Sequence, residues 1–110
     1  MDILRNQHYD ELTYVVYDAP FCWMHFGGQK KYQVESSLQR IREYLPSGVF
    51  FQCNRSTIIN LYRCIRSNKA KTEIEMDDQT KHRLSRRRKK DFFKAMYERP
   101  MKPENEIEAT

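Results

Sequence analysis

The first third of the chain alternates short apolar runs with turn residues, a pattern typical of β-strands. The runs 12–17, 21–26 and 30–35 are rich in β-branched and aromatic residues, and each has the length of one strand. Pro20 separates the first two runs. Gly27 and Gly28 separate the next two and are expected to form a two-residue hairpin turn, because glycine reaches positive φ without steric cost. The pattern therefore predicts three consecutive strands.

One helix is expected next. Ser36 and Gln39 have the spacing of a capping box, in which the serine is the N-cap of the first turn. Apolar residues then recur at helical spacing until the turn residues 46–48, and these apolar residues are Leu38, Ile41 and Leu45. We therefore expect an amphipathic helix between Ser36 and the turn.

Four more strands are predicted from shorter apolar or alternating runs, over residues 49–53, 64–67, 72–76 and 81–84. After the first of these, we expect Ser56 to cap a short helical turn that runs to Leu61. Ser85 is placed as the N-cap of a last helix over residues 86–97, which Pro100 ends. Seven strands and two short helices predict a mainly β fold with the helices packed at its edges.

The chain of 110 residues has the length of one domain. We expect residues 1–10 to be a lead-in with room for one short strand, residues 11–99 to form the domain, and residues 100–110 to be an acidic, disordered tail. No apolar run approaches the roughly 18 residues of a membrane span, and the N-terminus lacks the apolar stretch of a signal peptide. We therefore expect a cytoplasmic protein without a membrane partner.

Cysteines and histidines give no sign of a metal centre. The cysteine count is odd, no two cysteines have CxxC spacing, and Cys22 and His25 would point to opposite faces of one strand. The three cysteines are expected to be reduced thiols. The sequence also lacks the GxSxG, GxxxxGK[ST] and HExxH patterns. We accordingly expect no enzymatic activity, no metal and no cofactor.

Positive charge is concentrated in the second half of the chain. The net charge is +5, yet residues 51–97 carry thirteen basic and five acidic side chains, whereas residues 1–50 carry five basic and six acidic ones. Such an asymmetry favours a polyanionic partner, either a nucleic acid or an acidic membrane surface.

Five consecutive cations, residues 86–90, follow Ser85 at the predicted start of the last helix. The positive end of a helix dipole disfavours each of them by about a few tenths of a kcal/mol, so local stability does not explain them. A bound anion would explain them, because free N–H groups at a helix N-terminus and Arg side chains both bind phosphate. A solvated basic face or a transport signal is the alternative interpretation.

A second candidate lies where Asn54, Arg55 and Ser56 interrupt the apolar segment 50–60. Arg pairs with guanine, and Asn with adenine, through two hydrogen bonds each. A role in a turn or cap is the competing interpretation for Asn54 and Ser56, and it is favoured for Asn60. Arg55 has no evident structural role.

Four segments in a fixed order carry a family resemblance. Residues 50–61 read FFQCNRSTIINL, residues 11–16 read ELTYVV, residues 37–38 read SL, and residues 84–87 read LSRR. They resemble, in this order, the signature FF-x-hydrophobic-H-R-S-x-hydrophobic-V-N, the strand D-I-x-Y-I-E, the helix start S-L and the helix entry V-S-R-R of the LytTR family of bacterial DNA-binding domains. The similarity covers about residues 11–97.

This resemblance implies small antiparallel sheets with helices at the side, and DNA reading in the major groove by loops instead of a recognition helix. Carried over by position, the reading loops are residues 18–22, 52–57 and 85–89. The chain departs from the family pattern at Asn54, where members usually have His, and at Val16, where they have Glu.

Individual roles follow from the same carry-over. Asn54, Arg55 and Arg87 are expected to read bases. Pro20 and Phe21 stand where members often have a polar reader, so only a weak contact is expected from them. Contacts that touch or position the DNA backbone are expected from Ser56, Ser85, Arg86, Arg88, Lys89 and Lys90.

The resemblance also implies partners. It points to a bacterial transcription regulator on double-stranded DNA, often at paired direct repeats, which would place a dimer on the DNA. Many members belong to two-component systems and carry a receiver domain, for which this chain has no room, so it is either a stand-alone regulator or an excised domain. Two other classes stay open: a basic module that binds DNA or RNA without sequence preference, and an interaction module that docks an acidic protein or membrane.

Overall fold

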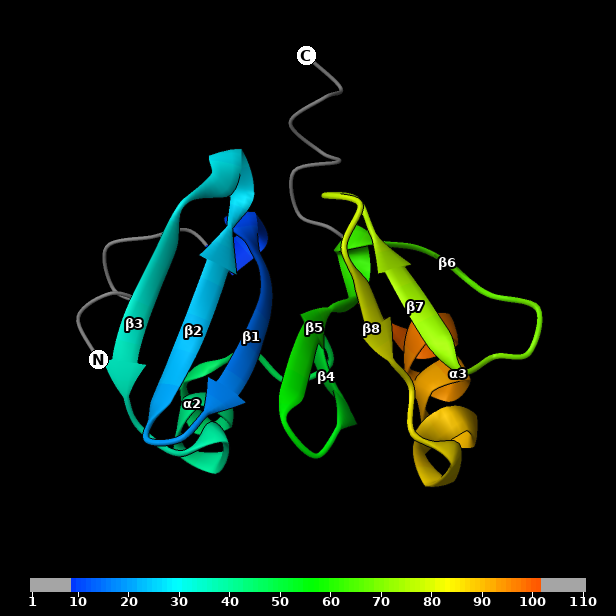
Figure 1. The fold of residues 1–110 in the computed structure, drawn as a ribbon. Helices are drawn as coiled ribbons and strands as arrows, with labels where there is room; N and C mark the ends of the chain where they lie inside the picture. The colour runs from blue at the N-terminus through cyan, green and yellow to red at the C-terminus, as the bar shows by residue number, and fades with distance from the viewer. Residues whose placement is uncertain (1–8, 102–110) are drawn as a thin grey trace, which may run out of the picture.

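The computed structural model describes residues 9–101 and shows a mainly β protein (Figure 1). Within these residues, eight strands form one five-stranded and one three-stranded antiparallel sheet, with two α-helices beside them. The predicted fold class is therefore confirmed. Most of the expected lead-in and tail lies outside the described residues. The described part of the lead-in, Tyr9 and Asp10, begins a 3-10 turn, η1 (Tyr9–Glu11).

The five-stranded sheet has the order β3-β2-β1-β5-β4. β1 (Leu12–Asp18), β2 (Phe21–Phe26) and β3 (Lys31–Glu35) follow one another as antiparallel neighbours. β5 (Thr57–Asn60) pairs with the other edge of β1, and β4 (Phe50–Asn54) pairs with β5 as a hairpin. β1 and β5 are consequently interior strands of this sheet.

The second sheet has the order β6-β7-β8 and stands beside β4 and β5 (Figure 1). Its strands are β6 (Cys64–Ser67), β7 (Glu73–Met76) and β8 (Lys81–Arg83), and the 3-10 turn η3 (Leu61–Arg63) connects β5 to β6. These three strands were all predicted within one residue of their observed bounds.

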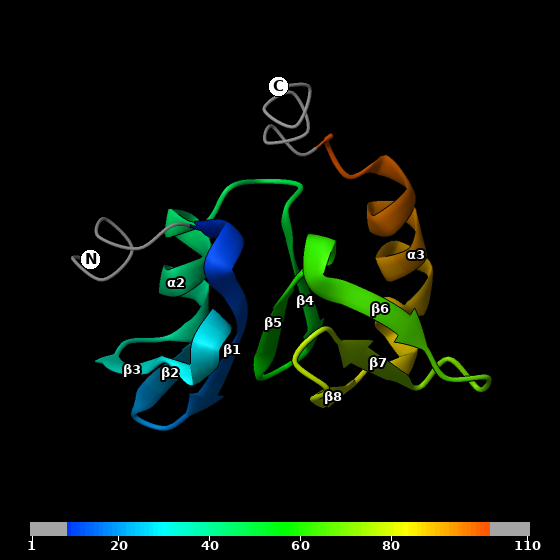
Figure 2. The same cartoon turned by 90° about the horizontal axis from the view of Figure 1, so that it is seen from above.

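Each α-helix packs on a different part of the protein, as the view from above shows (Figure 2). α2 (Leu38–Tyr44) covers one face of the five-stranded sheet, where its Leu38 and Ile41 are buried. α3 (Lys89–Glu98) lies against β4 and the second sheet, and its buried residue is Phe92. The 3-10 turn η4 (Arg86–Arg88) precedes α3.

Two hydrophobic cores lie on opposite faces of the interior strands. In β1, Val15 joins the core beneath α2, while the neighbouring Tyr14 joins the core shared with α3 and the second sheet. β5 behaves in the same way, because Ile58 enters the first core and Ile59 the second. Successive side chains of a strand point to opposite faces, so a strand between two cores has apolar residues at consecutive positions.

The segment after Ser56 is the largest difference from the sequence analysis. The predicted helical turn up to Leu61 is wrong, since residues 57–60 form β5 and all four are buried. A short helical turn would bury one side only, whereas Ile58 and Ile59 must enter two cores on opposite sides. The fold therefore has eight strands within the described residues instead of seven.

The N-cap of α2 is Ser37 and not Ser36. The Ser37 hydroxyl accepts a hydrogen bond from the Arg40 N–H at 3.1 Å, while the Ser36 hydroxyl donates to the Ser37 carbonyl oxygen. Gln39 therefore falls one position too early for the predicted capping box.

The hairpin between β2 and β3 also differs from the prediction. Instead of a two-residue turn, residues 27–29 form the 3-10 turn η2, closed by a 2.7 Å hydrogen bond from the Phe26 N–H to the Lys30 carbonyl oxygen. The left-handed residues are Gly28 at φ 73° and Gln29 at φ 65°. The turn is thus one residue longer than two adjacent glycines suggest.

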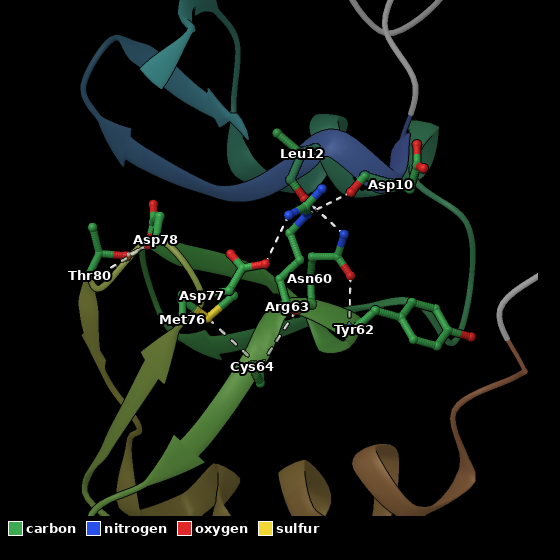
Figure 3. A network of polar contacts seen from close by, with 10 residues as sticks. All are labelled: Asp10, Leu12, Asn60, Tyr62, Arg63, Cys64, Met76, Asp77, Asp78 and Thr80. Atoms are coloured by element: carbon green, nitrogen blue, oxygen red, sulfur yellow. Dashed lines mark hydrogen bonds and ion pairs between the residues drawn. The ribbon is translucent and has the colours of Figure 1, made fainter. Parts of the chain in front are cut away.

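A polar network links η3 to both sheets (Figure 3). Asn60 donates from Nδ2 to the Leu12 carbonyl oxygen and accepts the Tyr62 N–H at Oδ1, each at 2.9 Å. Arg63 donates to the Asp10 carbonyl oxygen at 2.6 Å and forms an ion pair with Asp77 at 2.9 Å. The backbone-bonding role predicted for Asn60 is confirmed, and Arg63 joins η1, directly before β1, to Asp77, directly after β7.

Aromatic stacking forms a second joint between the sheets. Tyr14 of β1 stacks on His25 of β2 and contacts His82 of β8, with both ring centroids at 4.2 Å. Burial lowers the pKa of both histidines. Lys31 lowers the pKa of His25 further, and Asp78 opposes the shift of the pKa at both rings. The fold therefore favours neutral imidazoles at this joint.

This joint predicts an acid-dependent loss of stability. Both histidines have a lowered pKa in the folded state. As the pH falls below about 6.5, the unfolded chain therefore binds more protons than the folded chain, and the free energy of unfolding becomes smaller. Urea denaturation between about pH 7.5 and pH 5 measures the decrease. The variant His25→Phe/His82→Phe keeps aromatic contacts to Tyr14 and should lose less stability over this range. Equal losses would show that other groups cause the acid sensitivity.

Candidate nucleic-acid interface

The three loops singled out from the sequence lie at the same end of the protein. The β1–β2 connection, the β4–β5 turn and η4 all point toward the lower edge of Figure 1. Backbone hydrogen bonds join them in pairs. The Tyr17 N–H donates to the Ser56 carbonyl oxygen at 2.8 Å, and the Ser85 N–H donates to the Cys53 carbonyl oxygen at 2.9 Å. The three loops are therefore parts of one connected surface.

Asn54 holds the β4–β5 turn from within. Its Oδ1 accepts the Ser56 N–H at 2.9 Å and the Ser56 hydroxyl at 3.1 Å, while its Nδ2 donates to the Arg83 carbonyl oxygen at 2.8 Å. The residue is only 8% exposed. The oxygen and the nitrogen of the amide are thus both hydrogen-bonded inside the protein. Ser56 supplies both donors to the oxygen, so the two residues stabilise the turn together.

Arg55 stands at the tip of this turn. It is exposed, and its guanidinium makes no hydrogen bond or ion pair with any residue between 9 and 101. The turn beneath it is fixed on one side by Asn54 and on the other by the hydrogen bond between Tyr17 and Ser56. This arrangement presents a free cation on a rigid support.

Ser85 does not act as the predicted side-chain cap. Its backbone takes the N-cap position of η4, but its hydroxyl makes no capping bond and is buried without a hydrogen-bond partner among the described residues. The Ser85 N–H bonds to Cys53, and the Ser85 carbonyl accepts the Arg88 N–H at 3.0 Å. The backbone of Ser85, and not its side chain, therefore sets the start of η4.

The five cations after Ser85 do not share one environment. Arg86, Arg87 and Lys90 are exposed, and their side chains have no hydrogen-bond partner within the described residues. Arg88 is half-buried and donates to the Gln52 carbonyl oxygen at 3.4 Å, and Lys89 donates to the Ala70 carbonyl oxygen at 3.4 Å. Three of the five are thus free to meet a ligand, while two are partly engaged by the protein.

The first loop differs from the other two in charge. Residues 18–22 contain no basic side chain, and Asp18 is exposed. Pro20 is exposed in the turn after Asp18, and the half-buried Phe21 is already the first residue of β2. This loop offers apolar contact and backbone groups, and no cation.

Arg83 is a candidate that the sequence analysis did not name. It is exposed on β8, between the β4–β5 turn and η4, and its carbonyl oxygen receives the hydrogen bond from Asn54. Its sequence context, an alternation of basic and other residues in a short strand, gave no signal that distinguished it from Lys81.

Three further features of the described residues concern metal ligands, membrane-spanning helices and cysteine pairing. Within residues 9–101, no three His, Cys, Asp or Glu side chains are grouped so that they could hold a metal ion. In the same range, no helix is both long enough and apolar enough to cross a membrane. Cys22, Cys53 and Cys64 are unpaired, and burial raises the pKa of the Cys53 and Cys64 thiols to about 12.

The fold and its basic loop end define a mainly β domain that presents cations on fixed turns. A family model of the LytTr DNA-binding domain matches residues 7–97. The chain therefore belongs to the LytTR family of DNA-binding domains, which is not a family of enzymes.

A solved structure has the same fold. It is the LytTr DNA-binding domain of a Bacillus cereus protein described as a methyl-accepting/DNA response regulator. The two chains share 18% sequence identity with a TM-score of 0.72, and the match covers 82% of this chain and 84% of the other. The comparison with curated proteins gave no match.

The two serines at helix starts should differ in their contribution to stability. Ser37→Ala removes a real N-cap bond and should cost about 0.5–2 kcal/mol. Ser85→Ala removes a hydroxyl that has no partner and should cost less than about 0.5 kcal/mol or even stabilise the fold. Urea denaturation of the two variants measures both effects. A larger loss for Ser85→Ala would contradict the observed geometry.

Proposed function

We propose that this protein is a transcription regulator that binds double-stranded DNA in a sequence-specific way and reads the major groove with the β4–β5 turn and η4. The observation that supports this proposal best is the pair of exposed, unpartnered arginines, Arg55 and Arg87, on two loops joined by hydrogen bonds at one end of the fold. Arg is the side chain that most often reads a base in the major groove.

Arg55 and Arg87 are proposed to read bases. Each is exposed and free of protein partners within residues 9–101, so neither must break an internal bond to reach a base edge. Each also stands on a turn whose backbone is fixed, which limits the entropy lost on binding. A guanine offers O6 and N7 to the two forked N–H groups of one guanidinium.

Backbone contacts are proposed for the surrounding cations. Arg86 and Lys90 are free, whereas Arg88 and Lys89 would contact phosphate in addition to their present carbonyl partners. Ser56 and Ser85 position the loops. Pro20 and Phe21 would contribute only a weak apolar contact in the first loop, which carries no cation.

The cellular setting is proposed from the family. We infer a bacterial, cytoplasmic regulator of a two-component system that occupies paired direct repeats, with two protomers on the DNA. The response regulator named for the similar structure is consistent with this setting. Sedimentation of the protein with a duplex that carries one or two selected sites measures the number of protomers bound.

Selection of bound sequences from a random duplex pool tests the proposed function first. The selected duplex should then bind more tightly than a random duplex of equal length or an RNA duplex. Equal affinities would instead support the basic module without sequence preference. Binding of liposomes or acidic protein in place of any DNA would support the interaction module.

Base readers and phosphate contacts should respond differently to substitution. Arg55→Ala and Arg87→Ala should each weaken binding to the selected duplex by about 1–3 kcal/mol, which is far more than they weaken binding to a random duplex. Lys90→Ala should weaken both about equally, because a phosphate contact carries no sequence information. Fluorescence anisotropy with both duplexes measures these affinities.

The salt dependence gives an independent check. Lys90→Ala should reduce the slope of log K against log salt by about one, since one fewer phosphate is neutralised. If Arg87→Ala gave the same uniform loss as Lys90→Ala on both duplexes, Arg87 would be a phosphate contact and not a base reader.

A further inference from the structure

Three consecutive residues of β4 are bonded to residues 83–88, the segment that runs from the end of β8 through η4. Asn54 Nδ2 donates to the Arg83 carbonyl oxygen at 2.8 Å, and the Cys53 carbonyl oxygen accepts the Ser85 N–H at 2.9 Å. The Gln52 carbonyl oxygen accepts from Arg88 Nη1 at 3.4 Å. The hairpin that carries Arg55 and the segment that carries Arg87 are therefore held edge to edge.

We call these three contacts the seam, and within it Asn54 differs from Gln52 and Cys53. It is the one whose side chain makes the bond, and the opposite end of the same amide fixes the turn below Arg55 through Ser56. The amide is planar, so its oxygen and nitrogen stand at a fixed separation. One rigid group thus sets the position of the β4–β5 turn relative to β8.

We propose that Asn54 is a positioning residue that keeps Arg55 and Arg87 at a fixed spacing, so that both read one DNA site together, and that Asn54 itself touches no base. The proposal rests on the proposed function of the two arginines, and it replaces the base-reading role expected for Asn54 from the sequence.

Burial and hydrogen bonding both disfavour base reading by Asn54. An adenine contact needs the amide oxygen and the amide nitrogen together. Here the oxygen already has two donors, the nitrogen has a carbonyl partner, and the residue is 8% exposed. Turning toward a base would leave the Arg83 carbonyl and the Ser56 N–H without these partners, which is costly in a buried site.

A fixed spacing between Arg55 and Arg87 should affect sequence-specific DNA binding more than non-specific DNA binding. When the loops are already in place, the second arginine meets its base without a further loss of conformational entropy. A random duplex is held mainly through phosphates, which do not require this spacing. Loss of the Asn54 bond should therefore lower the affinity ratio between selected and random duplex.

The experiment compares two substitutions at Asn54 with a matched control. Asn54→Ser is neutral in charge and can still hold the Ser56 turn, but it is too short to reach Arg83. Asn54→His restores one acceptor and one donor at opposite ends of a ring. The control is Asn60→Ser, because Asn60 also bridges two backbone groups, at the other end of β5 and far from the loops.

Asn54→Ser should lower the affinity for the selected duplex about tenfold, and that for a random duplex by less than about twofold. Asn54→His should recover most of the affinity ratio. Asn60→Ser should lower the melting temperature and leave the ratio unchanged when binding is measured well below that temperature. If Asn60→Ser lowered the ratio between the affinities for selected and random duplex as much as Asn54→Ser does, Asn54 would contribute only to stability, and the proposal would be overturned.

A double-mutant cycle tests the coupling itself. Arg87→Ala should cost about tenfold or more in the wild-type protein and about threefold or less in the Asn54→Ser background, because the loops no longer act together. Equal costs in both backgrounds would overturn the proposal. A changed base preference at one position of the site in Asn54→Ser would identify Asn54 as a base reader and overturn it as well.

Hydrogen exchange separates a failure of this proposal from a failure of the proposed function. The Ser85 N–H should exchange faster in Asn54→Ser than in the wild type, whether or not DNA is read, since the seam has lost one of its bonds. Unchanged exchange there would overturn the proposal even if the protein is sequence-specific. If Asn54→Ser does not fold, Asn54→Asp replaces it, because it keeps the acceptor toward Ser56 and lacks the donor toward Arg83.

Discussion

The fold depends on the burial of β1 and β5 on both faces. Val15 and Ile58 enter one hydrophobic core while Tyr14 and Ile59 enter the other, so neither strand can shift by one residue without exchanging the two cores. This fixed register determines where each strand ends. The turn that carries Arg55 begins where β4 ends, and β5 returns directly from it. Packing in the interior therefore sets the position of the turn that carries Arg55.

Two asparagines complete this arrangement at opposite ends of the β4–β5 hairpin. Asn60 bridges β1 and η3, and Asn54 bridges the β4–β5 turn and β8. Burying an amide side chain is costly unless its oxygen and nitrogen form hydrogen bonds. Each of these two amides bonds to backbone groups of other segments. The same residue type thus anchors the interior end of the hairpin and its exposed end.

Local sequence signals predicted most strands, but they did not predict β5 or the long-range contacts between segments. Alternation over β2 and β-branched residues over β1 are local signals, and they are sufficient because those strands meet a core directly. Residues 57–60 were misread because Ser56 and Asn60 look like helix-capping residues, whereas burial between two cores is a long-range property. Local sequence likewise does not show that the amide of Asn54 is bonded inside the fold, because the Arg83 carbonyl that it meets is 29 residues away.

The five cations at residues 86–90 are disfavoured at the N-terminus of a helix, and the backbone conformation of this segment reduces the repulsion. A single helix from Arg86 would place five cations at the positive end of its dipole. The 3-10 turn η4 instead keeps Arg86, Arg87 and Arg88 outside α3, and the first turn of α3 contains Asp91 beside Lys89 and Lys90. Arg86 and Arg87 remain exposed and unpartnered in the described structure, although acidic neighbours would have stabilised them. Uncompensated cations on an ordered turn gain most from a polyanion, which is consistent with the membership of this chain in a family of DNA-binding domains.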